Sequence, residues 1–152
     1  LIGPIEEVMA YTISCHTAAE VEEVATLVAK FENQALSYFG SSWVSPGIYW
    51  INIYGTKANL YHQLDFNFWT EPDVDKHTTL LKHVHGSSER TPIEFSSNDM
   101  FPDELEDFAK AVRTGERPEV GAEEALRALA VVEASIRSSA ERRPVSIAEV
   151  LD

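Results

Sequence analysis

The chain has 152 residues, of which 25 are acidic and 12 are basic, so its formal net charge is −13. Nucleic acids and anionic membranes bind proteins through positively charged surfaces, and the charge therefore argues against both as partners. No apolar run approaches the roughly 18 residues of a transmembrane helix. The length predicts one domain covering residues 1–152, and the single cysteine, Cys15, agrees with a reducing, cytoplasmic location.

The first two thirds of the chain predict β-strands. Stretches rich in Val, Ile, Thr and aromatic residues are separated by turn signals such as Asn33-Gln34 and Ser45-Pro46-Gly47. The connections are short, which favours antiparallel pairing. The expected strands cover residues 5–14, 21–32, 35–45, 48–55, 59–70, 77–85 and, more weakly, 92–95.

Bulky aromatic residues occur on both faces of these expected strands. An antiparallel sheet usually leaves one face in water, so an aromatic second face suggests that something covers it. The aromatic residues that cannot all share one covered side are Trp43, Tyr49, Trp50, Tyr54 and Trp69.

The last third of the chain changes to helical periodicity. A first helix carries an apolar stripe, begins near Pro102 and stops at Gly115; the stripe comprises Phe101, Leu105, Phe108, Ala109 and Val112. A second helix runs from about Ala122 to Arg142 and is ended by Pro144. Together the elements predict an α+β fold, in which an open, mainly antiparallel sheet of about six strands has two C-terminal helices packed on one face.

The second helix is apolar around most of its circumference. Such a helix is normally buried on more than one side, and small residues such as Ala128, Val131 and Ala134 would allow close approach. Part of it is therefore expected to face protein outside this chain. The alternative is that alanine is present as a good helix former and is exposed to water.

The sequence offers little direct evidence for chemistry. Its seven glycines are scattered and form no G-x-G-x-x-G or Walker loop, so no site for a dinucleotide phosphate is predicted. His83 and His85 share one face of an expected strand near His77, but further metal ligands at a fixed spacing are not evident, and solvated or structural roles are preferred. The acidic cluster Glu20, Glu22 and Glu23 is interpreted as a solvated strand start. No catalytic, cofactor-binding or metal-binding residue is predicted.

Four segments in order resemble one known family. They are "LIGPIEEVMA", "VEEVATLVAKFENQALSYFGSSW", "IYGTKANL" and the long C-terminal stretch "ELEDFAKAVRTGERPEVGAEEALRALAVVEASIRSSAERRPVSI". Essentially the whole chain is similar to the C-terminal domain of the Gfo/Idh/MocA family, which includes glucose–fructose oxidoreductase and inositol dehydrogenase. The resemblance implies an NAD(P)-dependent oxidoreductase acting on a sugar, cyclitol or related polyol.

The resemblance also implies which parts are elsewhere. The family's Rossmann domain, which holds NAD or NADP and the lysine of an E-K-P motif, is not in this sequence. The helix with the catalytic Asp and His would lie just before "LIGPIEEV". The aromatic sheet face would make a homo-oligomer interface, and the apolar second helix would contact the cofactor domain or the linker. Trp43, Ser45 and Tyr49 are the candidate substrate-binding residues, because the resemblance places their turn at the edge of the pocket; ordinary packing in the sheet is an equally acceptable role for Trp43 and Tyr49.

Two residues depart from the family pattern. Gln34 stands where the family often has a glycine in the hairpin, so this turn is expected to be strained or wider. Ala58 stands where the family has the second glycine of "G-T-x-G". An alternative function is a stand-alone, non-catalytic module that uses its sheet for dimerisation or for binding a ligand or protein. The gene sequence upstream of Leu1 discriminates the two.

Overall fold

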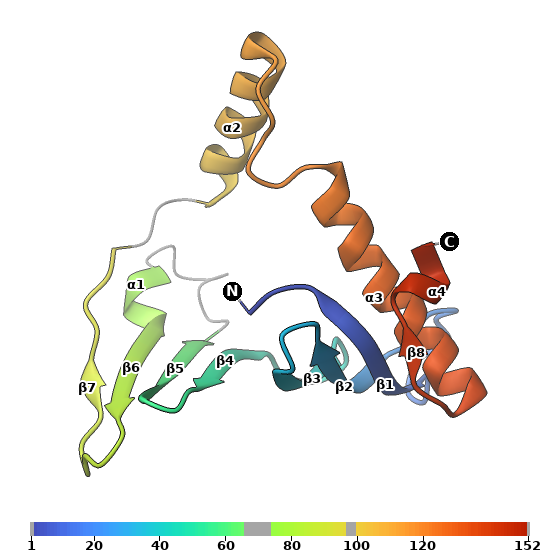
Figure 1. Cartoon of the computed structure of the whole chain (residues 1–152), viewed down its shortest axis with the longest axis horizontal. Helices are drawn as coiled ribbons and strands as arrows, with labels where there is room; N and C mark the ends of the chain where they lie inside the picture. The colour runs from blue at the N-terminus through green and yellow to red at the C-terminus, as the bar shows by residue number, and fades with distance from the viewer. Residues whose placement is uncertain (1, 66–73, 97–99, 152) are drawn as a thin grey trace. The chain divides into compact units, whose positions relative to one another are not determined.

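The computed structural model describes residues 2–65, 74–96 and 100–151, and they form an α+β fold with antiparallel strands (Figure 1). The chain divides into two compact units, Leu1–Ser45 with Asp107–Asp152, and Pro46–Glu106. The predicted fold class is confirmed. The strands differ from the prediction in one respect, because they are divided between two sheets of four strands each.

The first unit contains a sheet with the strand order β3-β2-β1-β8. Its strands are β1 (Ile5–Ile13), β2 (Val24–Phe31), β3 (Leu36–Ser42) and the short β8 (Val145–Ser146). The sequence analysis predicted the first three within a few residues and did not predict β8 or the short helix α4 (Ala148–Leu151) that follows it.

Alternation along the paired strands separates two faces of this sheet. Val8 pairs with Ala29 and Ala10 with Leu27, which places these four side chains on one face. The opposite face carries Tyr11, Ile13, Val28, Leu36 and Tyr38, and all five are exposed. This sheet therefore has an apolar and aromatic second face, formed by residues other than the five aromatic residues named from the sequence.

Helix α3 (Ala122–Glu141) covers the first of these faces, beside β1 (Figure 1). It contributes Ala130 and Ala134 to a core whose other members are Val8, Ala29, Val145 and Ile147. The large apolar residues of α3 are elsewhere on its surface: Leu126, Leu129 and Val132 are each more than half exposed. Small residues therefore make the helix–sheet contact. That the exposed part of α3 faces protein outside this chain stays a prediction.

Two serines near the end of α3 complete the edge of β1. The backbone N–H of Ala10 donates to Ser138 Oγ at 2.9 Å, and that of Thr12 donates to Ser139 Oγ at 2.9 Å. The β8 pairing covers only Glu7 and Val8. The serine hydroxyls thus accept hydrogen bonds from backbone N–H groups in the part of β1 that β8 does not reach. Ser138 is fully buried at this position.

The hairpin between β2 and β3 shows the consequence of Gln34. The N–H of Phe31 donates to the carbonyl of Ala35, and Gln34 adopts a left-handed conformation with φ 69°. A side chain in this region is disfavoured by contact between Cβ and the backbone. The expectation that Gln34 strains this turn is confirmed.

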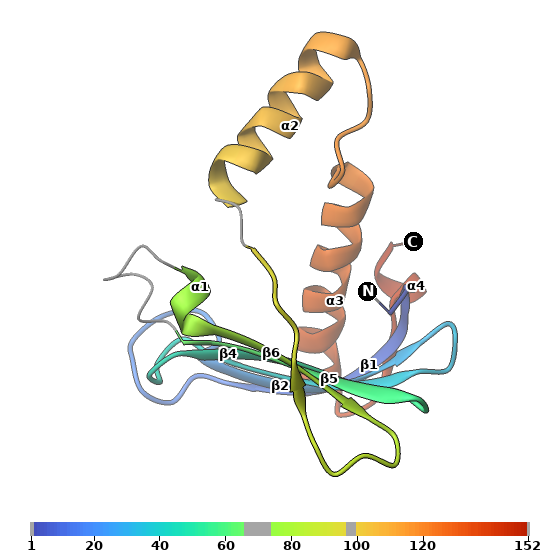
Figure 2. The same cartoon turned by 90° about the vertical axis from the view of Figure 1, so that its left-hand side faces the viewer.

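The second unit is an antiparallel sheet with the strand order β4-β5-β6-β7 (Figure 1), and its strands β4, β5 and β6 are labelled again in Figure 2. Its strands are β4 (Ile48–Tyr54), β5 (Ala58–Asp65), β6 (Thr78–Val84) and β7 (Thr91–Pro92), and the short helix α1 (Val74–His77) precedes β6. Wherever burial is described in this unit, no residue is fully buried. The predicted residues 66–70 of the fifth strand, with Trp69, lie outside the described residues.

Helix α2 (Met100–Thr114) begins in the second unit and ends in the first. Its predicted apolar stripe is present, and Phe101, Leu105, Phe108 and Val112 are all exposed by more than half. Neither α2 nor any other helix in the described parts of the chain has the length and apolar composition needed to cross a membrane.

Candidate functional site

Trp43 is the best anchored of the three predicted substrate-binding residues. It follows β3, and its backbone N–H donates to the carbonyl of Glu23 at 3.3 Å. Its indole Nε1–H donates to the carbonyl of Glu22 at 2.9 Å, while 56% of the side chain stays exposed. The ring is thus held in one place and still offers a face to an incoming molecule, which suits a pocket wall.

Ser45 and Tyr49 lie on different units. Ser45 is exposed and is the last residue of the first segment of the first unit, whereas Tyr49 belongs to β4 of the second. Tyr49 is 44% exposed and meets the ring of His62 edge to face, with ring centroids 6.0 Å apart. That Trp43, Ser45 and Tyr49 form one pocket wall stays a prediction.

His62 shares the face of the second sheet that carries Tyr49, because Ile51 pairs with His62 and Tyr49 pairs with the next residue on that face, Leu64. Its Nδ1 atom is shielded from water and has no hydrogen-bond partner among the described residues. A buried ring nitrogen without a partner is costly. A polar group placed beside this nitrogen, such as a hydroxyl, would therefore be a favourable neighbour for His62.

Glu23 is a structural residue that the sequence analysis interpreted wrongly. It was expected to be solvated with Glu20 and Glu22, but its side chain is only 1% exposed. Its carboxylate accepts from the backbone N–H groups of Cys15, His16 and Thr17, the first at 2.7 Å. A hydrogen bond from the Thr17 side chain and these N–H groups outweigh the effect of burial and lower the pKa of Glu23 to about 2.

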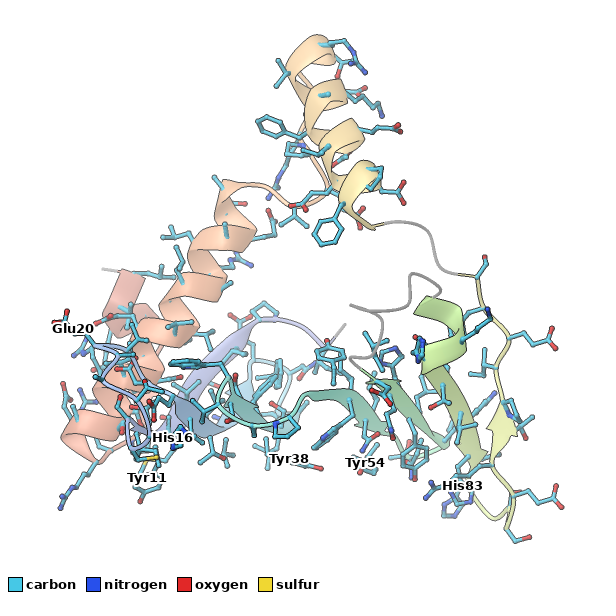
Figure 3. The ribbon with its side chains drawn as sticks, turned by 180° about the vertical axis from the view of Figure 1, so that it is seen from behind. Tyr11, His16, Glu20, Tyr38, Tyr54 and His83 are labelled. Carbon is cyan, nitrogen blue, oxygen red and sulfur yellow. The ribbon has the colours of Figure 1, made fainter. Side chains whose placement is uncertain are left out.

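The alternation of β2 contained the signal for this burial. Ala25, Leu27, Ala29 and Phe31 alternate onto one side, and two residues earlier the same side reaches Glu23. The ionised carboxylate holds the loop after β1 by three consecutive N–H groups. The same residue accepts from the Trp43 N–H through its carbonyl, so Glu23 orders both the loop and the tryptophan. Figure 3 labels His16 and Glu20 on this loop.

The other face of the second sheet is aromatic and polar. Tyr54 and Tyr61 meet edge to face with centroids 6.1 Å apart, and the Arg90 guanidinium lies 4.2 Å from the Tyr61 ring centroid. A shallow cavity of about 230 Å³ opens beside them, lined by Trp50, Asn52, Tyr61, Gln63, Thr79 and Arg90 among others. Tyr54 appears with Tyr11, Tyr38 and His83 among the labelled side chains of Figure 3. Such a mixture of rings, amides and a guanidinium is typical of protein interfaces.

The histidines show no metal centre within the described residues. His83 Nε2 lies 2.7 Å from the carbonyl of Ser87, so a backbone group occupies that nitrogen. Groups of three or more His, Cys, Asp or Glu side chains arranged to hold a metal ion are absent from residues 2–65, 74–96 and 100–151. In the structure, His83 therefore fixes the turn after β6.

Comparison with known proteins identifies the class of this fold. Residues 1–147 match the model of the oxidoreductase family, C-terminal α/β domain. The chain belongs to this family, the C-terminal domain of the Gfo/Idh/MocA oxidoreductases, and the resemblance found in the sequence is confirmed. No protein with a curated description matches it.

Solved structures agree with this family. All of this chain superposes on 45% of a proposed NADPH-dependent oxidoreductase from Desulfitobacterium hafniense, with 40% identity and a TM-score of 0.90. Aldose-aldose oxidoreductase from Caulobacter crescentus, solved with glycerol, is 22% identical with a TM-score of 0.72; the match covers 95% of this chain and 42% of that protein. The WlbA dehydrogenase from Bordetella pertussis, solved with NADH and UDP-GlcNAcA, is 20% identical with a TM-score of 0.68; the match covers 96% of this chain and 41% of that protein. The chain thus spans less than half the length of these proteins, and the last two comparisons support the fold alone.

Proposed function

We propose that this chain is the C-terminal domain of an NAD(P)-dependent oxidoreductase that acts on a sugar, cyclitol or related polyol. The observation that carries the proposal is 40% identity along the whole chain to a proposed NADPH-dependent oxidoreductase that is about twice as long. In this proposal the cofactor, NAD or NADP, is bound by an N-terminal domain outside residues 1–152. Its nicotinamide supplies the hydride chemistry, and this chain supplies pocket walls and a subunit interface. The cytoplasm is the proposed location, in agreement with the free and exposed thiol of Cys15.

The activity is tested on the full-length gene product. Purified protein should reduce NAD or NADP in the presence of a panel of polyols and sugars, and the 152-residue chain alone should bind neither cofactor. Isothermal calorimetry that shows tight NAD binding by the 152-residue chain would contradict the division of roles. A start codon at or near Leu1 would support the alternative, a stand-alone sheet module.

The substrate wall is assigned to Trp43, Ser45 and Tyr49. Tyr49 and Tyr54 lie on opposite faces of the same strand, because their positions differ by five and side chains alternate along a strand. In the full-length enzyme Tyr49→Phe should raise KM for the polyol severalfold and leave the Kd of the dinucleotide unchanged. Tyr54→Phe is the matched control and should leave KM unchanged. Equal effects of the two variants would remove Tyr49 from the wall.

The subunit interface is assigned to the exposed sheet faces. In the first unit, the sheet face opposite Val8 and Ala10 carries Tyr11 and Tyr38. In the second unit, the sheet face opposite Tyr49 carries Trp50, Tyr54 and Tyr61. Aromatic side chains exposed together are a common mark of an interface. Size-exclusion chromatography with light scattering should give a dimer or a larger oligomer. A clean monomer at high concentration would contradict this assignment.

A further inference from the structure

The imidazole of His62 has a ring nitrogen that is shielded from water and left without a hydrogen bond. This atom is Nδ1, on strand β5, and no donor or acceptor of the described residues reaches it. A polar atom in this position has lost its hydrogen bonds to water without gaining others, which costs free energy. Such an atom calls for a partner that the described residues do not supply.

Tyr49, on the neighbouring strand β4, holds this imidazole in place (Figure 1). Tyr49 pairs with Leu64 and Ile51 pairs with His62, so Tyr49 and His62 are diagonal neighbours on one face of the sheet. Their rings meet edge to face, with centroids 6.0 Å apart and an angle of 77° between the ring planes. Because this contact restricts both rings, the unpartnered nitrogen is held at one position on the sheet face.

The phenol group of Tyr49 adds a second polar group beside the first. The side chain is 44% exposed, and within the described parts of the chain its interaction is the ring contact with His62. Its hydroxyl is therefore available to a ligand. Ile51 and Leu64, on the same face, are apolar and partly buried. A few polar groups set in apolar surroundings are typical of a site for a small molecule.

The chemistry of imidazole indicates which ligand group fits Nδ1. In the neutral ring one nitrogen donates a hydrogen bond and the other accepts one, and the two tautomers exchange these roles. A carbonyl oxygen only accepts and an ammonium group only donates, so each of them fits one tautomer alone. A hydroxyl group does both and fits either tautomer, and it fits the phenol of Tyr49 as well. A molecule with several hydroxyl groups can therefore meet both side chains.

We propose that His62 is a substrate-binding residue, whose Nδ1 forms a hydrogen bond with a hydroxyl group of the polyol beside Tyr49. The inference rests on the proposed function and deepens it, because it adds a residue and a defined bond to the substrate wall. The bond is made only when the substrate is bound, which accounts for a polar atom without a partner in the chain by itself. His62 thereby contributes to specificity, since a ligand that lacks this hydroxyl leaves the nitrogen unpaired.

Kinetics of the full-length gene product test the bond. His62→Leu should raise KM for the best substrate of the polyol and sugar panel about tenfold and change kcat less than about twofold, because it removes uniform binding energy. His62→Asn, whose amide lies as many bonds from Cβ as Nδ1 does, should recover most of the loss. His85→Leu replaces an exposed histidine of the same unit and should change neither constant. An unchanged KM in His62→Leu, or no recovery in His62→Asn, would overturn the proposal.

Thermal denaturation of the full-length protein without substrate separates this role from a structural one. If Nδ1 has no partner in the free enzyme, His62→Leu removes a costly polar atom and should raise the Tm by roughly one to two degrees. A role in packing, or a bond to another part of the protein, predicts the reverse, because the variant then loses a contact. A lower Tm would show that Nδ1 already has a partner in the free enzyme, and would overturn the proposal.

A change in the ligand identifies the bonded hydroxyl group. Among singly deoxygenated analogues of the best substrate, one should lose about tenfold in kcat/KM with the unmodified enzyme. The same analogue should lose less than about twofold with His62→Leu, because the bond is already absent in that variant. If every analogue loses the same factor with both enzymes, no hydroxyl of the substrate meets His62 and the proposal is wrong.

The proposed function and this inference can fail separately. A full-length enzyme that oxidises a polyol or sugar with NAD(P), and whose KM is the same in His62→Leu, keeps the proposed function and removes the inference. An enzyme that oxidises no member of the panel removes the proposed function, and the inference falls with it. The activity of the unmodified protein therefore decides the first proposal, and the comparison of His62→Leu with His85→Leu decides the second.

Discussion

The two units of this chain each pair four antiparallel strands, but the first has a buried core and the second has none among its described residues. The difference is the helix: α3 lies on β1, and its Ala130 and Ala134 close the interior against Val8 and Ala29. Strand pairing satisfies backbone groups, but an isolated sheet needs a covering layer to exclude water. The second sheet has Ile51, Ile53 and Leu60 available for such a layer, but the described residues of its own unit bury none of them fully.

The largest expected effect is at the α3–β1 contact. Ala134 is fully buried against the sheet, so Ala134→Leu has no room for the added side chain and should lower the free energy of unfolding by about 2–3 kcal/mol. Urea denaturation followed by circular dichroism measures this. Leu129→Ala, on the exposed side of the same helix, should stay within about 0.5 kcal/mol in the 152-residue chain. Similar losses from the two variants would mean that the contrast between buried and exposed sides of α3 is wrong.

The next effect concerns the serines that complete β1. Ser138 accepts from Ala10 N–H and donates to the carbonyl of Arg143 at 2.7 Å, so Ser138→Ala removes the partner of the buried Ala10 N–H and of the partly buried Arg143 carbonyl. The expected cost is about 2 kcal/mol in the same denaturation experiment. Ser139→Ala removes one contact that is only partly buried and should cost less than half as much. If Ser138→Ala leaves the free energy of unfolding unchanged, water has replaced the hydroxyl and the contact between α3 and β1 is less tightly packed than described.

The sequence predicted the parts of the fold that produce a local pattern of residues along the chain. Stretches rich in β-branched and aromatic residues between turn signals located six strands to within a few residues, and the change to helical periodicity located α3. The division into two sheets, β8 and α4 were missed, because they depend on contacts between residues far apart in the chain. The pairing of Val8 with Val145 joins positions 137 residues apart, and neither flanking sequence signals it.

The same limit applies to the candidate site. Family resemblance suggested Trp43 and Tyr49, and the structure adds the partners that hold them, Glu22 and Glu23 for the former and His62 for the latter. The prediction for Glu23 was wrong because a carboxylate close in sequence to two other carboxylates is normally exposed to solvent. Its burial depends on three N–H groups from the loop, and loop conformation has no periodicity in sequence.

Acid should remove the contribution of Glu23 to the first unit. Its folded pKa is lowered from 4.5 to about 2, so it stabilises the fold above pH 4.5 and this contribution is lost as pH falls from 4.5 towards 2. Glu23→Gln should have a lower urea midpoint than the unmodified chain at neutral pH. The difference between the two midpoints should become smaller as the pH falls from 4.5 towards 2. Glu20→Gln, an exposed carboxyl on the same loop, controls for the charge. A gap that is independent of pH would show that the carboxylate is not the stabilising form.

The smallest expected effect is in the second unit, and it tests the comparison most directly. Ile53 faces Leu60 across β4 and β5 and is only partly buried, so Ile53→Ala should cost less than about 1 kcal/mol in the 152-residue chain. A fully buried apolar side chain shortened to alanine usually costs about 2–5 kcal/mol, and Val8→Ala in the first sheet provides the buried control. In the full-length protein the cost of Ile53→Ala should rise towards that of Val8→Ala, because the missing cover is then present. A large cost already in the 152-residue chain would mean that the second sheet has an interior of its own, and the difference between the two units would no longer hold.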